Sequence, residues 1–299
     1  LAGNPNVGKS TVFNALTGLK QHTGNWVGKT VGNAAGSYTY NNNKYLITDL
    51  PGTYSLCAHS AEEIIACRHI CLEKPDVTVI VCDASCLERN LNLVLQITEI
   101  TSKAVLCVNM MDEAEKKNIK TDITKLSQQL GIPVAATSAR SKKGLDKLMQ
   151  AIESVALSKE SNDITLVYTS RIENAISQLS PLTEKIETDS RTKRFICLKL
   201  LQGDSDTVDS LCKKYSTDEN YLKALISAAD RLTDNNFTDE IISCIFITAE
   251  GIAAECVKRS VDKKQVRDRK IDRILTGKLT GIPIMLLMLF IILWITITG

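Results

Sequence analysis

The feature that most restricts the fold of this chain is the run Gly3-Asn-Pro-Asn-Val-Gly-Lys-Ser10 near its amino terminus. It matches G-x-x-x-x-G-K-[ST], in which glycines let the backbone approach an anion, successive N–H groups point at its oxygens, and the lysine adds a charge. A helix should begin at this loop with its positive dipole end facing the anion. The run therefore predicts a phosphate site built from Gly3, Asn4, Pro5, Asn6, Val7, Gly8, Lys9, Ser10 and Thr11.

Short apolar segments alternate with helix-length segments in the first half of the chain. Four of them, at residues 44–49, 77–82, 104–109 and 133–138, are rich in apolar or β-branched residues and predict strands. This alternation is typical of an α/β domain, a mostly parallel sheet with helices on both faces. We place this domain at residues 1–157.

The pattern changes after residues 151–163. Ile172, Ala175, Ile176 and Leu179 follow helical spacing, and the segments 195–201, 221–232 and 241–257 also indicate helices. We therefore predict a second, small α-helical domain over residues 163–261.

The carboxyl-terminal end of the sequence is apolar. Residues 279–299 are 21 residues without a charge, which at about 1.5 Å per residue would cover the ~30 Å hydrocarbon core of a bilayer. A buried core helix fits poorly because no polar stripe interrupts the segment. We predict a transmembrane helix, truncated at its far edge. The basic juxtamembrane segment 262–278 before it favours a cytoplasmic position for the preceding domains.

Composition excludes some classes of function. A formal net charge of +2 over 299 residues does not indicate a nucleic-acid-binding protein. The ten cysteines form no C-x-x-C pair, and two of them, Cys82 and Cys107, lie within predicted buried strands. We interpret the cysteines as reduced and structural, with a metal-ligand role for Cys67 and Cys71, four residues apart, as the alternative.

Three further motifs follow predicted strands. The D-x-x-G run can hold Mg²⁺ through its aspartate and meet a γ-phosphate with its glycine amide. In the N-x-x-D run the carboxylate of Asp112 can accept two hydrogen bonds from guanine, although a helix N-cap is an alternative role. Backbone amides after the last strand can support the guanine oxygen. The residues concerned are Asp49, Leu50, Pro51 and Gly52, then Asn109, Met110, Met111 and Asp112, and finally Ser138, Ala139 and Arg140.

Because the carboxyl ends of parallel strands meet at one edge of a sheet, these motifs predict a single GTP site. Lys9 should reach the β- and γ-phosphates, and Ser10 and Asp49 should hold Mg²⁺. The predicted catalytic groups are Lys9, Gly52 and, by the resemblance described next, Thr30.

The sequence resembles the translation-factor-like P-loop GTPases and, within them, the amino-terminal part of the FeoB ferrous iron transporter family. GNPNVGKST, QHTGNWVGKTV, DLPGTYSL, NMMD, SARSKKGLDKL and the later GIPIMLLMLF carry this resemblance, which covers essentially the whole chain. It implies that Thr30 ligates Mg²⁺ and senses the γ-phosphate within a switch loop containing Gly28, Lys29 and Thr30. It also implies that Asn6 helps hold K⁺ in potassium-activated members.

The resemblance further implies that the helical domain favours the GDP-bound state and links the nucleotide to the membrane. Expected partners are GTP and GDP, ferrous iron through permease segments outside this sequence, the lipid membrane, small cytosolic Feo accessory proteins and further copies of the chain, but no nucleic acid. The expected location is the bacterial inner (cytoplasmic) membrane, with the GTPase and helical domains in the cytoplasm.

The expected function is that of a slow GTPase that controls or drives ferrous iron uptake. Thr53 stands where Ras-like enzymes place a water-orienting glutamine, so we expect slow hydrolysis unless a cation at Asn6 compensates. Glu62 and Glu63 are either water-positioning groups or, as we prefer, carboxylates in the first turn of a helix. Trp26 is interpreted as a packing residue. The alternative function is a membrane-anchored regulatory GTPase without transport activity. A ribosome- or RNA-associated GTPase is disfavoured by the near-neutral net charge and the predicted membrane segment.

Overall fold

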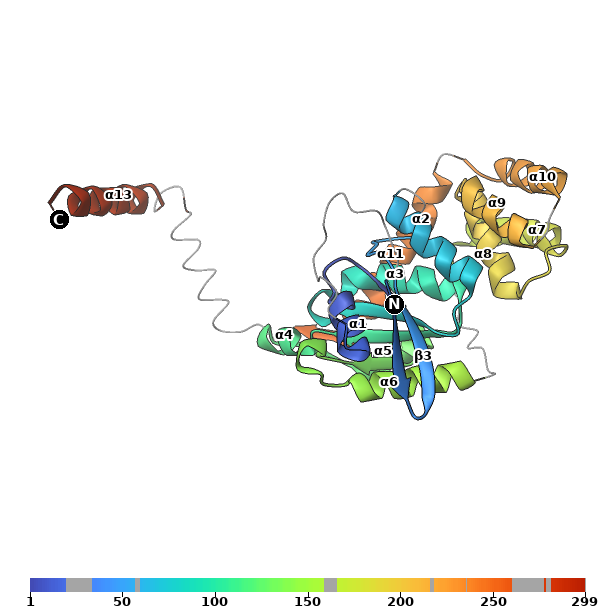
Figure 1. The fold of residues 1–299 in the computed structure, drawn as a ribbon. Helices are drawn as coiled ribbons and strands as arrows, with labels where there is room; N and C mark the ends of the chain where they lie inside the picture. Colours follow the sequence, from blue (N-terminus) through green and yellow to red (C-terminus); the bar gives the residue numbers. More distant parts are fainter. Residues whose placement is uncertain are drawn as a thin grey trace. The chain divides into compact units, whose positions relative to one another are not determined.

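The computed structural model describes residues 1–19, 34–56, 60–158, 166–215, 218–234, 236–259, 277 and 281–298 (Figure 1). The chain divides into two units, Leu1–Lys258 and Arg259–Gly299. The first unit contains an α/β part and a helical part that share one hydrophobic core. The two units are described separately.

A parallel sheet forms the centre of the first unit. Its strands are β1 (Ala2–Gly3), β4 (Thr78–Asp83), β5 (Ala104–Asn109) and β7 (Val134–Ala136), in the order β1-β4-β5-β7. Every neighbouring pair is parallel. The predicted mostly parallel sheet is thus confirmed, and its central strands β4 and β5 are buried on both faces.

A hairpin of β2 (Ala34–Tyr40) and β3 (Asn43–Asp49) adjoins this sheet. Asn41 and Asn42 form its turn with φ angles of 46° and 63°, the left-handed values that a two-residue hairpin loop requires. The Thr48 carbonyl accepts a hydrogen bond from the Leu1 amino group at 2.6 Å, and the Leu50 amide donates to the Leu1 carbonyl at 3.0 Å. These two bonds join the end of β3 to the start of β1.

Helices cover both faces of the parallel sheet because side chains alternate along each strand. Val79 and Val81 of β4 pack in the cluster that contains Leu148 and Met149, whereas Ile80 faces the opposite cluster. The helices of the α/β part are α1 (Lys9–Thr17), α2 (Ala61–Arg68) continued by the π-helix η1 (His69–Glu73), α3 (Leu87–Ile100), α4 (Met111–Lys116), α5 (Ile123–Leu130) and α6 (Leu145–Leu157). Short 3₁₀ turns at Ala84–Cys86 (η2) and Ala139–Ser141 (η3) and a small sheet of β6 (Ile119–Thr121) and β8 (Val257–Arg259) complete the elements.

The helical part consists of α7 (Ser170–Thr183), α8 (Ser190–Leu201), α9 (Ser205–Lys214), α10 (Glu219–Asp230) and α11 (Phe237–Cys256). The predicted helices at 195–201, 221–232 and 241–257 correspond to α8, α10 and α11. Helix α8 begins five residues and α11 four residues earlier than predicted, and α10 lies two residues earlier at both ends. Helix α11 packs against α3, and α8 also contacts α3 (Figure 1). The helical part is therefore in direct contact with the α/β part.

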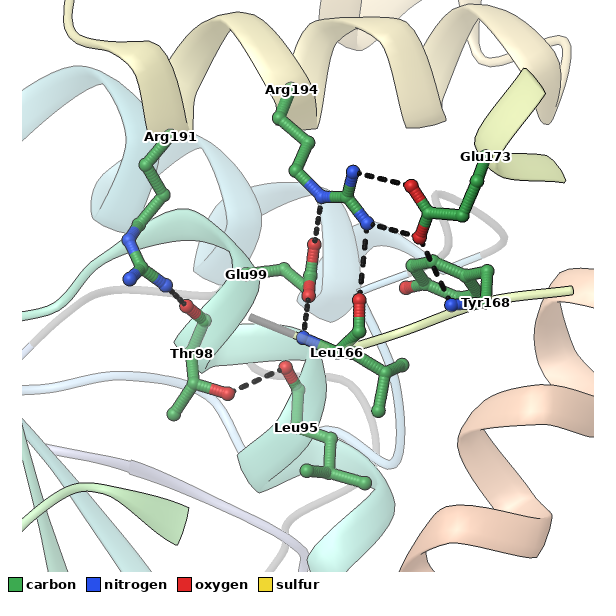
Figure 2. A network of polar contacts seen from close by, with 8 residues as sticks. All are labelled: Leu95, Thr98, Glu99, Leu166, Tyr168, Glu173, Arg191 and Arg194. Atoms are coloured by element: carbon green, nitrogen blue, oxygen red, sulfur yellow. Dashed lines mark hydrogen bonds and ion pairs between the residues drawn. The ribbon is translucent and has the colours of Figure 1, made fainter. Parts of the chain in front are cut away.

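Charged side chains hold α8 against α3. Figure 2 shows the guanidinium of Arg194, on α8, between Glu173 and Glu99, which lie on α7 and α3. It donates to Glu173 at 2.7 and 2.9 Å and to the Leu166 carbonyl at 3.1 Å, and its Nε lies 3.6 Å from Glu99 Oε2. Burial raises the pKa of Glu99, whose Oε1 accepts from the Leu166 amide at 2.8 Å. Of its charged members only Glu99 is buried, and the network joins α8 to α3 and α7.

The second unit contains α13 (Gly281–Thr298). Among the described residues, no helix has both the length and the apolar character needed to cross a membrane. The expected transmembrane helix over residues 279–299 therefore stays a prediction.

The structure describes nine cysteines, and most of them are buried. The sulfur atoms of Cys67 and Cys71 lie 3.9 Å apart within the continuous helix formed by α2 and η1. No group of three or more His, Cys, Asp or Glu side chains suited to a metal ion occurs in the described part of the chain. Both side chains are buried in the hydrophobic core of the first unit.

Candidate nucleotide-binding site

The loop between β1 and α1 has the backbone shape that its sequence predicts. Helix α1 begins at Lys9, directly after Gly8, whose φ of 80° is left-handed. A Cβ atom on Gly8 would lie 2.4 Å from Asn109 Nδ2, and one on Gly3 would lie 2.4 Å from the Val81 carbonyl oxygen. Glycine is therefore required at both positions, because the backbone φ is positive and because a Cβ atom would collide with a neighbouring atom. The loop leads into the positive end of a helix, as an anion site needs.

Two sequence motifs that lie 40 residues apart meet at this helix start. Lys9 Nζ donates to Asp49 Oδ1 at 2.5 Å and also to the Leu50 carbonyl, and Ser10 Oγ donates to Asp49 Oδ2 at 3.1 Å. Lys9 and Asp49 are both less than one-tenth exposed. A hydroxyl and a carboxylate this close are hard oxygen donors that fit Mg²⁺, and the neighbouring ammonium suits phosphate oxygens.

The segment after Asp49 lies against the phosphate loop. A Cβ on Gly52 would lie 3.2 Å from Pro5 Cα, and the Thr53 amide donates to the Gly3 carbonyl at 3.2 Å. The Thr53 hydroxyl, in the place of the Ras-like glutamine, donates to the Ser55 carbonyl. The geometry gives Thr53 a role in shaping this turn.

Glu62 and Glu63 lie in the first turn of α2, where Glu62 is exposed and Glu63 is half-buried. Glu63 forms a capping box with Ser60, and its Oε1 accepts from Ser55 Oγ at 3.1 Å. Its carboxylate is thus engaged at the helix start, where it stabilises the N-terminal amides.

Asn109 ties the base end of the site to the phosphate loop. Its Nδ2 donates to the Val7 carbonyl at 3.1 Å, and its Oδ1 accepts from Thr137 Oγ1 at 3.1 Å and from the Ala139 amide at 3.0 Å. Sequence reasoning missed Thr137, which is 1% exposed. The only sequence signal for it was a polar residue inside a predicted strand directly before Ser138.

Asp112 lies in the first turn of α4, whose N-cap Met110 has a left-handed φ of 60°. The Asp112 amide donates to Ser138 Oγ at 3.2 Å, so the N-x-x-D run and the segment after β7 are held together. The Arg140 side chain is exposed, whereas Ser138 and Ala139 are buried. The expected base-binding segments therefore lie side by side.

Some of the expected site residues lie outside the part of the chain that the structure describes, and two others, Asn4 and Asn6, make no contact that identifies a ligand. Gly28, Lys29 and Thr30, and with them Trp26, fall outside the described residues. Asn4 is 2% exposed, and neither of its amide atoms has a hydrogen-bond partner in the part of the chain that the structure describes. Asn6, in the middle of the phosphate loop, has a left-handed φ of 65°.

Replacing Asn109 by Ala is expected to lower the free energy of unfolding of the nucleotide-free protein by about 3 kcal/mol, since each lost hydrogen bond contributes about 1 kcal/mol. Urea unfolding followed by circular dichroism measures this. Thr137→Val removes one of the three bonds, together with a contact between Thr137 Oγ1 and Cys107 Sγ at 3.2 Å, at nearly constant volume. It should therefore cost about half as much. Equal losses for the two variants would contradict this role of Asn109.

Comparison with known proteins agrees with this arrangement. A family model described as ferrous iron transport protein B matches residues 1–152, and one described as the FeoB cytosolic helical domain matches residues 168–258. The Fe(2+) transporter FeoB of Escherichia coli K12 is 32% identical over 99% of this chain and 38% of its own length. A Porphyromonas gingivalis protein named as a fusion of Fe(2+) transport protein A and FeoB is 35% identical over 97% of this chain and 36% of its own length.

Solved structures with a similar fold are also FeoB cytosolic domains. The cytosolic domain of L. pneumophila FeoB has a TM-score of 0.72 at 30% identity, covering 86% of this chain and 98% of that one. The cytosolic domain of T. maritima FeoB in its GMPPNP form has a TM-score of 0.70 at 29% identity, covering 86% and 97%. An S. thermophilus NFeoB mutant bound to GDP has a TM-score of 0.71 at 29% identity, covering 86% and 98%.

The fold and the motifs at this edge of the sheet define a P-loop GTPase domain, an enzyme that binds and hydrolyses GTP, followed by a helical domain. With both family models matched in order, the chain belongs to the ferrous iron transport protein B family. It spans little more than a third of the length of the curated relatives it matches.

Proposed function

We propose that this chain is the GTP-hydrolysing cytosolic part of a ferrous iron uptake transporter, in which the GTP state controls or drives the membrane permease. The observation that carries the proposal is the meeting of Lys9, Ser10 and Asp49 at the start of α1, in a domain that shares its core with the helical part. The names of the relatives support ferrous iron as the transported ion.

Each motif has a role in this proposal. Lys9 binds the β- and γ-phosphates, the Gly52 amide meets the γ-phosphate, and Asp112 accepts hydrogen bonds from guanine, with the Ser138–Arg140 backbone beside its oxygen. Ser10 and Asp49, with Thr30, would hold Mg²⁺, which neutralises phosphate charge when bound. Residues 3–11 form the phosphate cradle, and Gly28 and Lys29 directly precede Thr30 in the sequence. Leu50, Pro51, Met110 and Met111 shape the neighbouring loops.

Hydrolysis is slow in this proposal because Thr53 donates to Ser55 and offers no carboxamide to orient water. A potassium ion beside the phosphates, held in part by Asn6, would supply a charge that Ras-like enzymes receive from an arginine.

The proposal divides the chain into a GTPase domain at 1–157, a helical domain at 163–261, a basic segment at 262–278 and a membrane segment at 279–299. The support for the last is its sequence of 21 uncharged residues after nine Lys or Arg against three Asp between Lys258 and Lys278. The location is then the bacterial inner membrane, with the first two domains in the cytoplasm. Accessory Feo proteins and other copies of the chain are candidate partners.

The alternative is a membrane-anchored GTPase that regulates another protein and transports nothing itself. Ferrous iron uptake into vesicles containing the full-length protein tests between them. We expect uptake by wild type with GTP, and uptake by Asp112→Asn with xanthosine triphosphate but not with GTP. Uptake that ignores both nucleotide and mutation would contradict nucleotide control of transport. No uptake by any form, with GTP hydrolysis intact, would favour the alternative.

A further inference from the structure

A cavity of about 380 Å³ lies in the first unit, lined by residues within the segments 70–76, 100–103 and 189–195. Two of these segments directly precede strands β4 and β5, which run parallel to each other. The candidate nucleotide site lies at the carboxyl ends of the sheet, about 20 Å away along strands of this length. The cavity is therefore separate from that site, and we call it the rear cavity.

The wall of the rear cavity comes from both parts of the first unit. The π-helix η1 and the residues before β5 belong to the α/β part, whereas residues 189–195 contain the start of α8. Ile70, Ile100 and Phe195 give the wall an apolar side. Ligand sites in proteins are typically cavities of about 300–1,000 Å³ with apolar walls and a few polar groups. The rear cavity has the size and the mixed lining of such a site.

The charges of this wall do not cancel. Lys74 Nζ pairs with Asp189 Oδ2 at 3.0 Å. Lys103, Arg191 and Asp76 remain, so that the wall keeps one positive charge in excess. Lys103 is exposed and forms no ion pair with any residue that the structure describes. An anion is therefore the kind of ligand whose charge this wall complements.

The start of α8 places Arg191 beside this excess charge. Arg191 donates to the carbonyl of Thr98, in the last turn of α3 (Figure 2). The neighbouring carboxylate of Asp189 accepts from the amide of Thr192 at 2.8 Å and from its hydroxyl at 2.7 Å, in addition to its ion pair with Lys74. Since these groups already occupy Asp189, it adds little negative charge to the side of the cavity where Lys103 lies.

We propose that the rear cavity binds a small organic anion, a carboxylate or a phosphate monoester with an apolar or aromatic body. The anionic group lies toward Lys103 and Arg191, because ammonium and guanidinium groups form charge-assisted hydrogen bonds with carboxylate and phosphate oxygens. The body packs against Ile70, Ile100 and Phe195. A ligand in this position contacts both parts of the first unit. The inference goes beyond the proposed function and does not depend on it.

Benzoate and phenyl phosphate are the probes, because they share an aromatic body and differ in the anionic group. Saturation-transfer-difference NMR with the full chain gives their dissociation constants. Mg²⁺ and saturating GDP are present, so that phenyl phosphate is kept out of the phosphate loop. We expect at least one probe to bind with a dissociation constant of about 1 mM, which ligands of about ten non-hydrogen atoms reach. Binding of one probe alone identifies the anionic group.

Lys103→Met is expected to weaken binding of the probe about fivefold, because it removes an exposed cation and keeps an unbranched side chain. Lys103→Arg keeps the charge and should bind like wild type. Lys120→Met is the matched control. Lys120, on β6, is also an exposed lysine without an ion pair among the described residues, but it does not line the cavity. Its replacement should leave the dissociation constant unchanged.

Ser102→Phe tests the volume of the cavity and leaves its charges in place. Ser102 is half-buried in the wall, so that a phenyl group there takes up part of the space. We expect no detectable binding of either probe, with the circular dichroism spectrum and the GDP affinity of wild type. Wild-type protein that binds neither probe would overturn the proposal. Equal binding by wild type, Lys103→Met and Ser102→Phe would overturn it too, because the probe would then bind elsewhere.

Discussion

Asp112→Asn is expected to weaken GTP and GDP binding by about 10³-fold and to create a preference for xanthine nucleotides. A carboxylate accepts both guanine donors, whereas the amide presents one donor of its own to a guanine amine and leaves polar groups unpaired. Xanthine carries an oxygen in place of that amine, so the amide can donate to it. The Asp112 backbone is held by Ser138 Oγ at 3.2 Å, so the substitution changes the chemistry without moving the group.

Binding of fluorescent GDP and xanthosine diphosphate to both proteins measures this change. Glu113→Gln is the matched control, because Glu113 lies in the same first turn of α4 and its carboxylate pairs with Lys116 at 3.0 Å on the surface. It should bind GDP like wild type. If Asp112→Asn kept its preference for guanine, Asp112 would be a helix-capping residue and base recognition would lie elsewhere.

The parts of the fold that could be predicted from sequence are those with a local pattern. Strands β4 and β5 are continuous apolar runs because both of their faces are buried, so their place in a parallel sheet was evident. Strand β2 was missed because the first four residues of Ala34–Tyr40 are all small, so the sequence shows no run of large apolar or β-branched side chains there. The phosphate loop was predicted because its local backbone angles require glycine, and those glycines are visible in the sequence.

Long-range polar contacts had no such signal. Asn109 was expected to belong to a base-binding motif, but nothing in the sequence shows that its amide reaches Val7, 102 residues away. Lys199 and Leu56, whose carbonyl accepts from Lys199 Nζ, are 143 residues apart. In the sequence, Lys199 resembles any polar residue of a helix, so nothing there predicts its contact with Leu56. Such contacts depend on how α8 packs against α3, and that packing is set by the tertiary fold.

Gly8→Ala is expected to reduce affinity for guanine nucleotides by at least about 10²-fold, because the phosphate loop must move by a substantial part of an ångström. The new Cβ would lie 2.4 Å from Asn109 Nδ2. Asn109 cannot turn aside at low cost, since its amide holds the Val7 carbonyl on one side and the Ala139 amide on the other. The collision therefore displaces the phosphate loop from the end of β5, and the two ends of the nucleotide site lose their spacing.

Gly18→Ala separates this collision from backbone strain alone. Gly18, at the other end of α1, has a φ of 71°, close to the 80° of Gly8, but a Cβ atom on Gly18 would have no neighbour within 4 Å among the described residues. Both variants bear the cost of about 1 kcal/mol for a left-handed alanine, and only Gly8→Ala bears the collision. Calorimetric titration with GDP should show near wild-type affinity for Gly18→Ala. Equal loss in both variants would mean that the stability of α1, and not the contact between Gly8 and Asn109, keeps the site in shape.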